Sequence, residues 1–217
     1  MKYPNLSEEK KLWKKGYKRI VSLDEAGRGA LAGPVFVGAI ILNKNIKNKN
    51  ERFKFKSLLK IVKDSKKLSP QKRENIFKIL ISCSFLEYTV SMVSEGIIDK
   101  ANIKNATELA MERCVAKFKR RPDFLIIDGK HISSKKLKKI EHKLIVKADE
   151  KVFSCAAASI IAKVKRDRFL KKIDKRYPEY GFCRHKGYGT KFHKKRIKKY
   201  GFCKIHRKTF RPIRDER

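Results

Sequence analysis

The stretch RIVSLDEAGRGALAGPVFVGAIIL, Arg19 to Leu42, contains two apolar runs on either side of a glycine-rich turn. The first run, Arg19 to Leu23, ends at two adjacent acids, Asp24 and Glu25. The second run, Val35 to Leu42, is apolar and β-branched nearly throughout. Short apolar runs joined by a turn are typical of neighbouring strands. We therefore predict a sheet whose first strand presents two carboxylates at its end.

Strand-like and helix-like segments alternate along the rest of the chain. Ser69 and Pro70 indicate a helix start, with Ser as the N-cap and Pro in the first turn, followed by an apolar face of Ile76, Phe77, Leu80 and Ile81. The other expected elements are strands at 85–93, 124–127 and 144–146 and helices at 106–118 and 153–173. The first turns of 153–173 are rich in Ala and Ser, which would let this helix lie close on a sheet. The order predicts a mixed α/β fold with one central sheet.

Two segments differ from the rest in composition. Asn43 to Asn50 is rich in Asn and Lys, and we expect it to be a solvated loop. From Tyr177 onward Gly, aromatic, His and Lys residues dominate. We therefore divide the chain into a core, residues 1–176, and a small basic C-terminal extension, residues 177–217.

The charge is the strongest feature of the composition. Lys and Arg number 58 against 22 Asp and Glu, a formal net charge of +36. Nucleic acid is the natural partner for such a chain, because basic side chains that neutralise phosphates release condensed counterions. A general preference for lysine over other polar residues is an alternative that composition does not exclude. A membrane surface is less favoured, because no long amphipathic basic helix stands out.

The cysteines and the N-terminus indicate the compartment. The five cysteines are an odd number without a CxxC pair, which favours reduced thiols over a disulfide framework. Met1 to Lys15 lacks the apolar region of a secretion signal. No apolar stretch approaches the ~20 residues that span a bilayer. We expect a soluble, cytoplasmic protein without membrane association.

Acids are scarce, and three of them follow strand-like runs. Asp24, Asp128 and Asp149 stand at these ends, and Glu25 adds a fourth carboxylate. Ligand groups converge at strand ends in α/β sheets, and four neighbouring carboxylates cannot all ionise without a cation. Oxygen ligands that face phosphate favour Mg²⁺ or Mn²⁺, and two such ions ~3.5–4 Å apart would promote in-line displacement at a phosphodiester. Each acid alone could equally be a turn residue, as Asp often is.

Six segments resemble, in the family's order, those of ribonuclease HII, the type 2 ribonuclease H family: DEAGRGALAGPV (Asp24 to Val35), DSKKLS (Asp64 to Ser69), NIKNAT with the following AM (Asn102 to Met111), IIDG (Ile126 to Gly129), KAD…AAASIIAKVKRD (Lys147 to Asp167) and HKGYGT..H (His185 to His193). They span nearly the whole chain. The sister family, ribonuclease HIII, usually carries a GKG-like turn where this chain has Gly27 to Gly29.

The resemblance implies a ribonuclease H-like fold, with a five-stranded mixed sheet flanked by helices and a helical C-terminal part. It implies a metal-dependent endoribonuclease that cuts the RNA strand of RNA–DNA hybrids. It also implies cleavage on the 5′ side of ribonucleotides embedded in duplex DNA, with 5′-phosphate and 3′-hydroxyl ends, by two-metal-ion catalysis with Mg²⁺ or Mn²⁺. We expect a monomer whose extension contributes to substrate binding.

The resemblance also assigns residues. By matching position, the catalytic and metal-binding set is Asp24, Glu25, Asp128 and Asp149. The turn Gly27, Arg28 and Gly29 would read the ribose 2′-hydroxyl at the RNA-to-DNA junction, since glycine lets backbone amides approach the sugar. Tyr188 would stack on the sugar after the junction. Lys66 would contact a phosphate near the cut, with Asp64 and Ser65 shaping its loop.

Two features depart from the family pattern. Residues 43–63 are longer and richer in Lys and Asn than expected, and Lys130 follows IIDG where Asn is common. Neither departure touches the four carboxylates.

Other residues have competing interpretations. Cys183, His185, His193, Cys203 and His206 include zinc-ligand types, but their spacing matches no compact zinc motif. The run Lys194 to Lys199, with Arg207 and Lys208, is either a phosphate-binding surface or a solvated helix face. We interpret Lys135 to Lys139 as solvated surface, Arg166 and Asp167 as a structural ion pair, and Tyr177, Tyr180 and Phe182 as packing of the extension.

Two other functions fit part of the pattern. A non-catalytic basic RNA-binding protein would explain the charge but not the placed carboxylates. A metal nuclease for structured DNA would share the carboxylates but would not need a 2′-hydroxyl.

Overall fold

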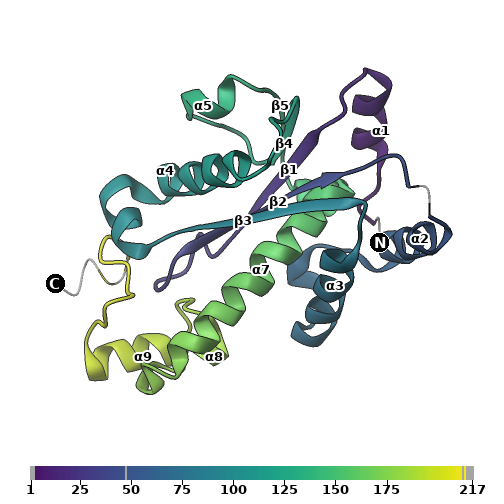
Figure 1. The fold of residues 1–217 in the computed structure, drawn as a ribbon. Coiled ribbons are helices and arrows are strands. Elements are labelled where there is room, and N and C mark those ends of the chain that lie inside the picture. Colours follow the sequence, from purple (N-terminus) through teal and green to yellow (C-terminus); the bar gives the residue numbers. More distant parts are fainter. Residues whose placement is uncertain (1–2, 47, 212, 214–217) are drawn as a thin grey trace.

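The protein is described here by a computed structural model that covers residues 3–46, 48–211 and 213 (Figure 1). Five strands are formed, β1 (Ile20–Ala26), β2 (Val35–Leu42), β3 (Leu86–Val93), β4 (Phe124–Asp128) and β5 (Glu141–Ile145). The helices are α1 (Ser7–Lys14), α2 (Lys49–Ile61), α3 (Pro70–Ser82), α4 (Glu95–Ala116), α5 (Lys135–Lys138), α6 (Ala148–Lys151), α7 (Phe153–Asp174), α8 (Phe182–His185) and α9 (Lys191–Tyr200), with 3₁₀ turns η1 (Ser65–Lys67) and η2 (Pro178–Tyr180).

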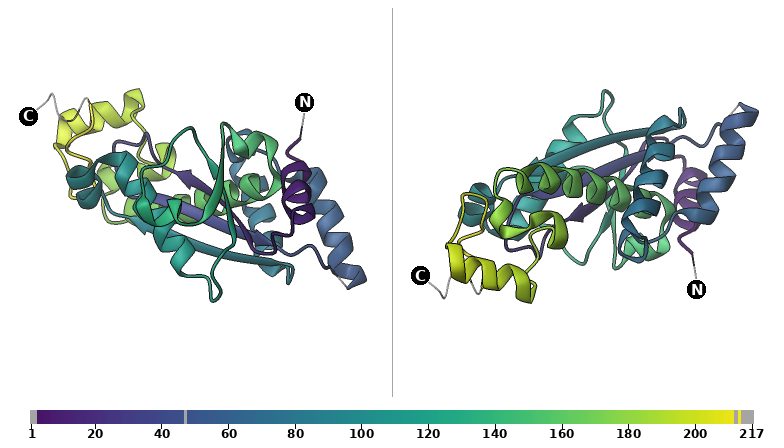
Figure 2. Two further views of the ribbon diagram at one scale, coloured as in Figure 1. Left: turned by 90° about the horizontal axis from the view of Figure 1, so that it is seen from above. Right: turned by 90° about the horizontal axis from the view of Figure 1, so that it is seen from below.

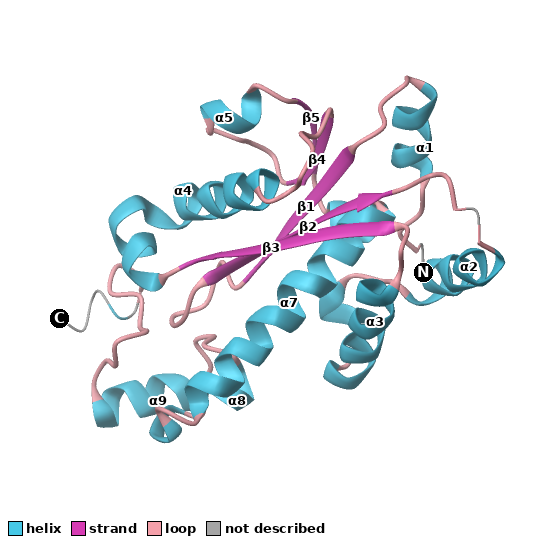
Figure 3. Ribbon diagram, in the orientation of Figure 1, coloured by secondary structure: helices cyan, strands magenta, loops and turns pink. Residues whose placement is uncertain are grey.

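The strands form one mixed sheet in the order β3-β2-β1-β4-β5. β1, β2 and β3 pair antiparallel as a meander, whereas β4 pairs parallel with both β1 and β5. The five-stranded mixed sheet expected from the family resemblance is confirmed. The strand β2 spans 35–42 as predicted, and all of its residues are buried because helices cover both faces (Figure 3).

Two helical layers enclose the sheet. The core on one face joins α2, α3 and α7, and the core on the other joins α4 with the α5 segment (Figure 1). The close packing expected of the Ala-rich helix is confirmed at Gly38, where a Cβ would lie 2.4 Å from the carbonyl oxygen of Ala158. Only glycine therefore lets α7 lie this close to the centre of β2.

Several predicted boundaries were wrong. The first strand continues past Leu23 to Ala26, because Asp24, Glu25 and Ala26 still pair with β2. The loop predicted to reach Asn50 ends at Asn48, whose side chain accepts from the Asn50 and Glu51 amides and caps α2. Lys47 lies outside the described residues.

The helix predicted over 106–118 begins earlier, at Glu95, and ends at Ala116. It is broken at Asn102, where φ is +64°, and the Asn102 side chain accepts from the Asn105 amide. This break explains why the periodic pattern was visible only in the second half.

The helix start at Ser69 is confirmed, since its hydroxyl accepts from the Lys72 amide at 3.3 Å. Its apolar face is correct for Ile76, Phe77 and Leu80, but Ile81 is 39% exposed. The helices α1 and α2 were missed. They are lysine-rich, and Leu58 is the buried residue of α2, so their apolar signal is weak.

The extension packs at one end of the molecule, opposite α1 and α2, as Figure 2 shows. Tyr180 and Phe182 are buried there with Leu31 and Leu170, which confirms their packing role. No helix within the described ranges is long and apolar enough to cross a membrane.

Candidate active site

The sheet brings two of the predicted acids side by side. Asp24 lies in β1 and Asp128 ends β4, and these strands run parallel with Leu23 opposite Ile127. The sequence predicted that Asp149 directly follows a strand. This was wrong, because Asp149 lies in the short helix α6. The Asp128 carboxylate accepts a hydrogen bond from the Ala148 amide at 2.9 Å. This bond ties the start of α6 to the end of β4.

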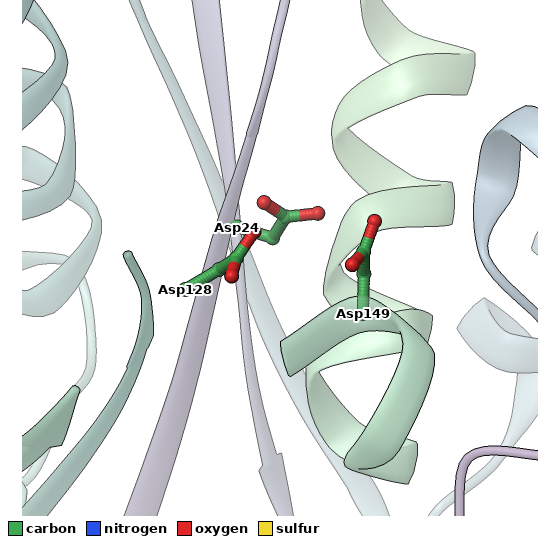
Figure 4. A group of neighbouring side chains, drawn as sticks. All are labelled: Asp24, Asp128 and Asp149. Carbon is green, nitrogen blue, oxygen red and sulfur yellow. The ribbon is translucent and has the colours of Figure 1, made fainter. Parts of the chain in front are cut away.

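The three aspartates converge on one space between the strands and α6 (Figure 4). One carboxylate oxygen from each lies within 4.8 Å of the others. Asp24 and Asp149 are only 4% and 3% exposed. Three hard oxygen donors this close suit Mg²⁺ or Mn²⁺ rather than a soft metal. The residues present therefore fit the divalent ion that the resemblance implies.

The electrostatics of the cluster favour a bound cation. Burial raises the pKa of Asp24 well above its usual value, and the neighbouring Glu25, Asp128 and Asp149 raise it further. Burial likewise raises the pKa of Asp149, although Lys66 opposes the shift. Such groups resist ionisation together, and a divalent ion would relieve both the burial and the repulsion.

Glu25 stands apart from the three aspartates. Its carboxylate is not in the group of converging oxygens. It lies 3.5 Å from the Arg28 guanidinium instead. Burial raises the pKa of Glu25, and Arg28 lowers it in part. The predicted fourth carboxylate thus borders the cluster and faces the glycine-rich turn.

The DSKK segment forms η1 beside Asp149. The Lys66 ammonium lies 3.4 Å from the Asp149 carboxylate, and the Lys66 side chain is 78% exposed. The Asp64 carboxylate accepts from the Lys66 amide at 2.9 Å, which shapes the loop. Ser65 is buried, and its hydroxyl bonds that of Ser159 at 2.9 Å. Of the two exposed lysines in this segment, Lys66 is the one whose ammonium lies beside an aspartate of the cluster.

The predicted junction-reading residues lie on two adjoining loops. Arg28 and Gly29 are exposed, whereas Gly27 is buried with φ +92°. The Gly187 carbonyl accepts from the Leu31 amide at 2.8 Å, which joins the loop of Tyr188 to the segment after the turn. The Tyr188 ring is 37% exposed.

A cavity of about 450 Å³ opens beside Glu25 and Asp128. It is lined in part by Lys104 and His131, which were not among the predicted site residues. Glu108 also lines it and accepts from the Ser133 and Ser134 amides, which holds the loop after β4. The NIKNAT segment that carries Lys104 was the available signal.

Two interpretations of arginines were wrong. Arg166 does not pair with Asp167. It is fully buried and donates to the carbonyls of Ala32, Pro34 and Lys186, while Asp167 pairs with Arg73 and Lys163. Arg207 is also fully buried and cannot belong to a surface that grips phosphate.

The zinc-type residues do not converge. The Nδ1 atom of His206 lies 3.1 Å from the Cys203 sulfur, but its Nε2 faces His193 Nε2 at 3.2 Å. These ligand atoms are engaged in hydrogen bonds that point in different directions. All five cysteines are free.

Comparison with protein families gives one match over most of the chain. The family described as Ribonuclease HII matches residues 21–213. A ribonuclease HII from Caldicellulosiruptor saccharolyticus is 45% identical over 202 residues, covering 93% of this chain and 91% of that protein. A ribonuclease HII from Chlamydia caviae is 43% identical over 206 residues, covering 95% and 90%.

Solved structures agree. The crystal structure of the ribonuclease H2 from Pyrococcus horikoshii OT3 is similar with a TM-score of 0.69 at 30% identity, covering 91% of this chain and 96% of that one. Bst-RNase HIII in complex with Mn²⁺ has a TM-score of 0.62 at 16% identity, covering 91% and 68%, which is a likeness of fold.

Proposed function

The chain belongs to the ribonuclease HII family, metal-dependent endonucleases of the ribonuclease H type that act on RNA–DNA hybrids, and from that premise we propose that it also cuts on the 5′ side of single ribonucleotides embedded in duplex DNA. The observation that carries the proposal is the convergence of Asp24, Asp128 and Asp149 beside a glycine turn and an exposed tyrosine. The first feature suits phosphodiester hydrolysis, and the second suits reading a 2′-hydroxyl.

The three aspartates and Glu25 would hold Mg²⁺ or Mn²⁺. The positive charge of the ion would offset the cost of burying these neighbouring acids. When bound, a pair of such ions supplies Lewis-acid stabilisation of the charge that develops on the phosphodiester oxygens. In the reaction, a water oxygen bonds to phosphorus and the bond from phosphorus to the 3′ oxygen breaks. The attacking water loses a proton and the leaving 3′ oxygen takes one up, so the products are a 3′-hydroxyl and a 5′-phosphate.

The chain's own groups bind and orient the substrate. Lys66 extends from η1 next to Asp149 and would contact a phosphate close to the cut. The exposed Arg28 and Gly29 would bring the backbone of the turn to the ribose 2′-hydroxyl. The half-exposed Tyr188 would stack on the sugar that follows the junction. The buried Ser65 would fix the Lys66 loop against α7 through its hydrogen bond with the Ser159 hydroxyl.

The rest of the chain has supporting roles in this proposal. Residues 1–176 form the catalytic core, and residues 177–217 contribute Tyr188 and the exposed lysines of α9 to substrate binding. A net charge of +36 supports a polyanionic substrate. We further propose that the protein acts as a monomer in the cytoplasm, in keeping with its free cysteines.

The test is a cleavage assay on duplex DNA that contains one ribonucleotide, beside an all-DNA duplex. We expect a cut on the 5′ side of the ribonucleotide with Mg²⁺ or Mn²⁺, lost with a chelator. Asp24→Asn should reduce the rate by about 1000-fold, which corresponds to about 4 kcal/mol of transition-state stabilisation.

A matched pair of variants controls this test. Asp149→Asn should reduce the rate by a similar factor, whereas Glu150→Gln, next to it and 36% exposed, should cut normally. Cleavage of hybrids without cleavage at the single ribonucleotide would reject the proposed substrate. Normal turnover by Asp24→Asn would remove Asp24 from the mechanism.

A further inference from the structure

The C-terminal segment 203–207 runs beside the backbone that follows the glycine turn. The Gly33 amide donates to the Ile205 carbonyl at 2.8 Å, and the Arg207 amide donates to the Leu31 carbonyl at 2.8 Å. Ala32 and His206 form an antiparallel bridge between these bonds. The segment therefore adds a short strand-like pairing to residues 31–33, although it lies more than a hundred residues away in sequence.

The Arg207 side chain extends this pairing to the turn itself. Its Nε donates to the backbone carbonyl of Gly33 at 2.9 Å. Its Nη1 donates to the carbonyl of Arg28 at 2.8 Å, and its Nη2 donates to the carbonyl of Gly27 at 2.7 Å. The guanidinium is fully buried, and burial lowers its pKa to about 9. Burying a cation is costly unless its donors are satisfied. The planar fork of arginine meets this condition by fixing three carbonyls of the loop at once.

A second chain of contacts leads from the same segment to Tyr188. The Nε2 atoms of His206 and His193 lie 3.2 Å apart, and His193 Nδ1 lies 2.9 Å from the Tyr188 carbonyl oxygen. A carbonyl only accepts, so His193 carries its proton on Nδ1 and accepts at Nε2. His206 must then donate from Nε2. This agrees with its Nδ1 accepting from the Cys203 amide at 3.0 Å.

We propose that His206 and Arg207 are positioning residues for junction reading. Arg207 holds the backbone of the glycine turn, and His206 holds Tyr188 through His193, so that one segment sets the separation of the two reading elements. This inference rests on the proposed function, in which the turn reads the ribose and Tyr188 stacks on the next sugar. Neither residue touches substrate. Both act by ordering the elements before the nucleic acid arrives.

The two elements should be needed together only where RNA meets DNA. A single embedded ribonucleotide presents one 2′-hydroxyl and one following deoxyribose, so it requires both elements at their set distance. A continuous RNA strand offers a 2′-hydroxyl at every register and does not depend on the following deoxyribose. Loosening the segment should therefore change the preference between substrates, rather than all cleavage equally.

The first test uses Arg207→Lys, which keeps the charge but loses the fork. We expect kcat/KM on the single-ribonucleotide duplex to fall by about 10- to 100-fold, as for small misplacements of substrate-positioning groups. The fall on a long RNA–DNA hybrid should be several-fold smaller. Lys204→Arg, an exposed neighbour in the same segment, should match the wild type on both substrates.

The second test changes His206, so it does not rely on the Arg207→Lys variant being correctly folded. His206→Ala should lower cleavage at the single ribonucleotide, and His206→Gln, which keeps a donor near the Nε2 position, should restore it. In a Tyr188→Ala background, His206→Ala should cause little further loss. Additive losses, or failure of glutamine to restore activity, would overturn the route through Tyr188.

Hydrogen exchange separates this inference from the proposed function. In the free protein, Arg207→Lys should speed exchange of the amides of residues 31–33 without affecting those of β1 and β2. If the wild type does not cut at a single ribonucleotide, the proposed function fails while the exchange result still decides the positioning role. If the wild type cuts, but Arg207→Lys keeps both its substrate preference and its exchange rates, the positioning role is rejected.

Discussion

Gly27 shows how strongly one residue of the turn is constrained. Its φ is +92°, a region that side chains rarely adopt, and a Cβ there would lie 1.9 Å from the Arg166 Nε. Gly29, two residues on, has open space around its missing Cβ. The same motif thus contains Gly27, which packing requires to be glycine, and Gly29, which has open space beside its Cα where a ligand could approach.

Gly27→Ala should destabilise the protein by about 1–3 kcal/mol, through backbone strain and displacement of Arg166. Gly29→Ala should leave stability within about 0.5 kcal/mol of the wild type, because nothing obstructs the added methyl group. Urea unfolding followed by circular dichroism measures both. Equal stability of the two variants would contradict the packing role of Gly27.

At the scale of elements, the extension is held together internally by polar contacts as well as by its apolar cluster. The histidines His185, His193 and His206 are buried, and their ring nitrogens bond backbone groups or each other. Burial lowers the pKa of His193 to about 3 and that of His206 to about 4. The neutral rings are therefore part of the folded structure.

This arrangement predicts a pH dependence of stability. An unfolded histidine titrates near about 6.5, so between about pH 6.5 and 4 the unfolded chain binds a proton that folded His206 does not. The contribution of His206 is thus complete above pH 6.5 and is lost as the pH falls toward 4. Within this range His206 should lower the free energy of unfolding by about 1.4 kcal/mol for each unit by which the pH falls.

His206→Gln removes this titration but keeps a donor toward His193. Its free energy of unfolding should fall less than that of the wild type between pH 6.5 and 4.5, when each is measured by urea denaturation. His131→Gln, which changes an exposed histidine, serves as the control. Parallel pH profiles of wild type and His206→Gln would contradict the buried neutral state of His206.

At the scale of the whole molecule, charge dominates. A net charge of +36 is spread over a chain whose buried arginines among the described residues, Arg73, Arg166 and Arg207, account for only three of its 58 basic residues. Most of the charge therefore lies outside the core, but contact with a substrate requires basic side chains on the right face. The exposed lysines of α9 follow directly after the Tyr188 loop in sequence, and His193 of α9 bonds the Tyr188 carbonyl, so α9 begins next to the proposed junction-reading surface.

Binding to a hybrid should weaken steeply with salt. We expect a log–log slope of about −4 or steeper, since each phosphate contact contributes about 0.9. Changing Lys194, Lys195, Lys198 and Lys199 to Gln should flatten the slope. The same change at Lys135, Lys136, Lys138 and Lys139 removes equal charge from the α5 segment and should have a smaller effect. Equal effects of both sets would show that the α9 lysines act only through net charge.

Much of the fold was predictable because its local signals agree with its packing. The apolar run of β2, the Ser69–Pro70 start of α3 and the small residues of α7 each specify an element without reference to distant residues. The lysine-rich α1 and α2 could not be predicted in this way, since they bury few side chains and contain few apolar residues.

The sequence by itself determined which acids could form the site, because Asp24 and Asp128 belong to strands that apolar runs identify. Only the tertiary structure decided how the carboxylates divide. A bond from the Ala148 amide to Asp128 brings Asp149 into the cluster, while Arg28 draws Glu25 to its edge. The tertiary structure alone also buried Arg166 and Arg207. An arginine is exposed by default, and its burial becomes favourable only where folding gathers backbone carbonyls from distant segments around its donors.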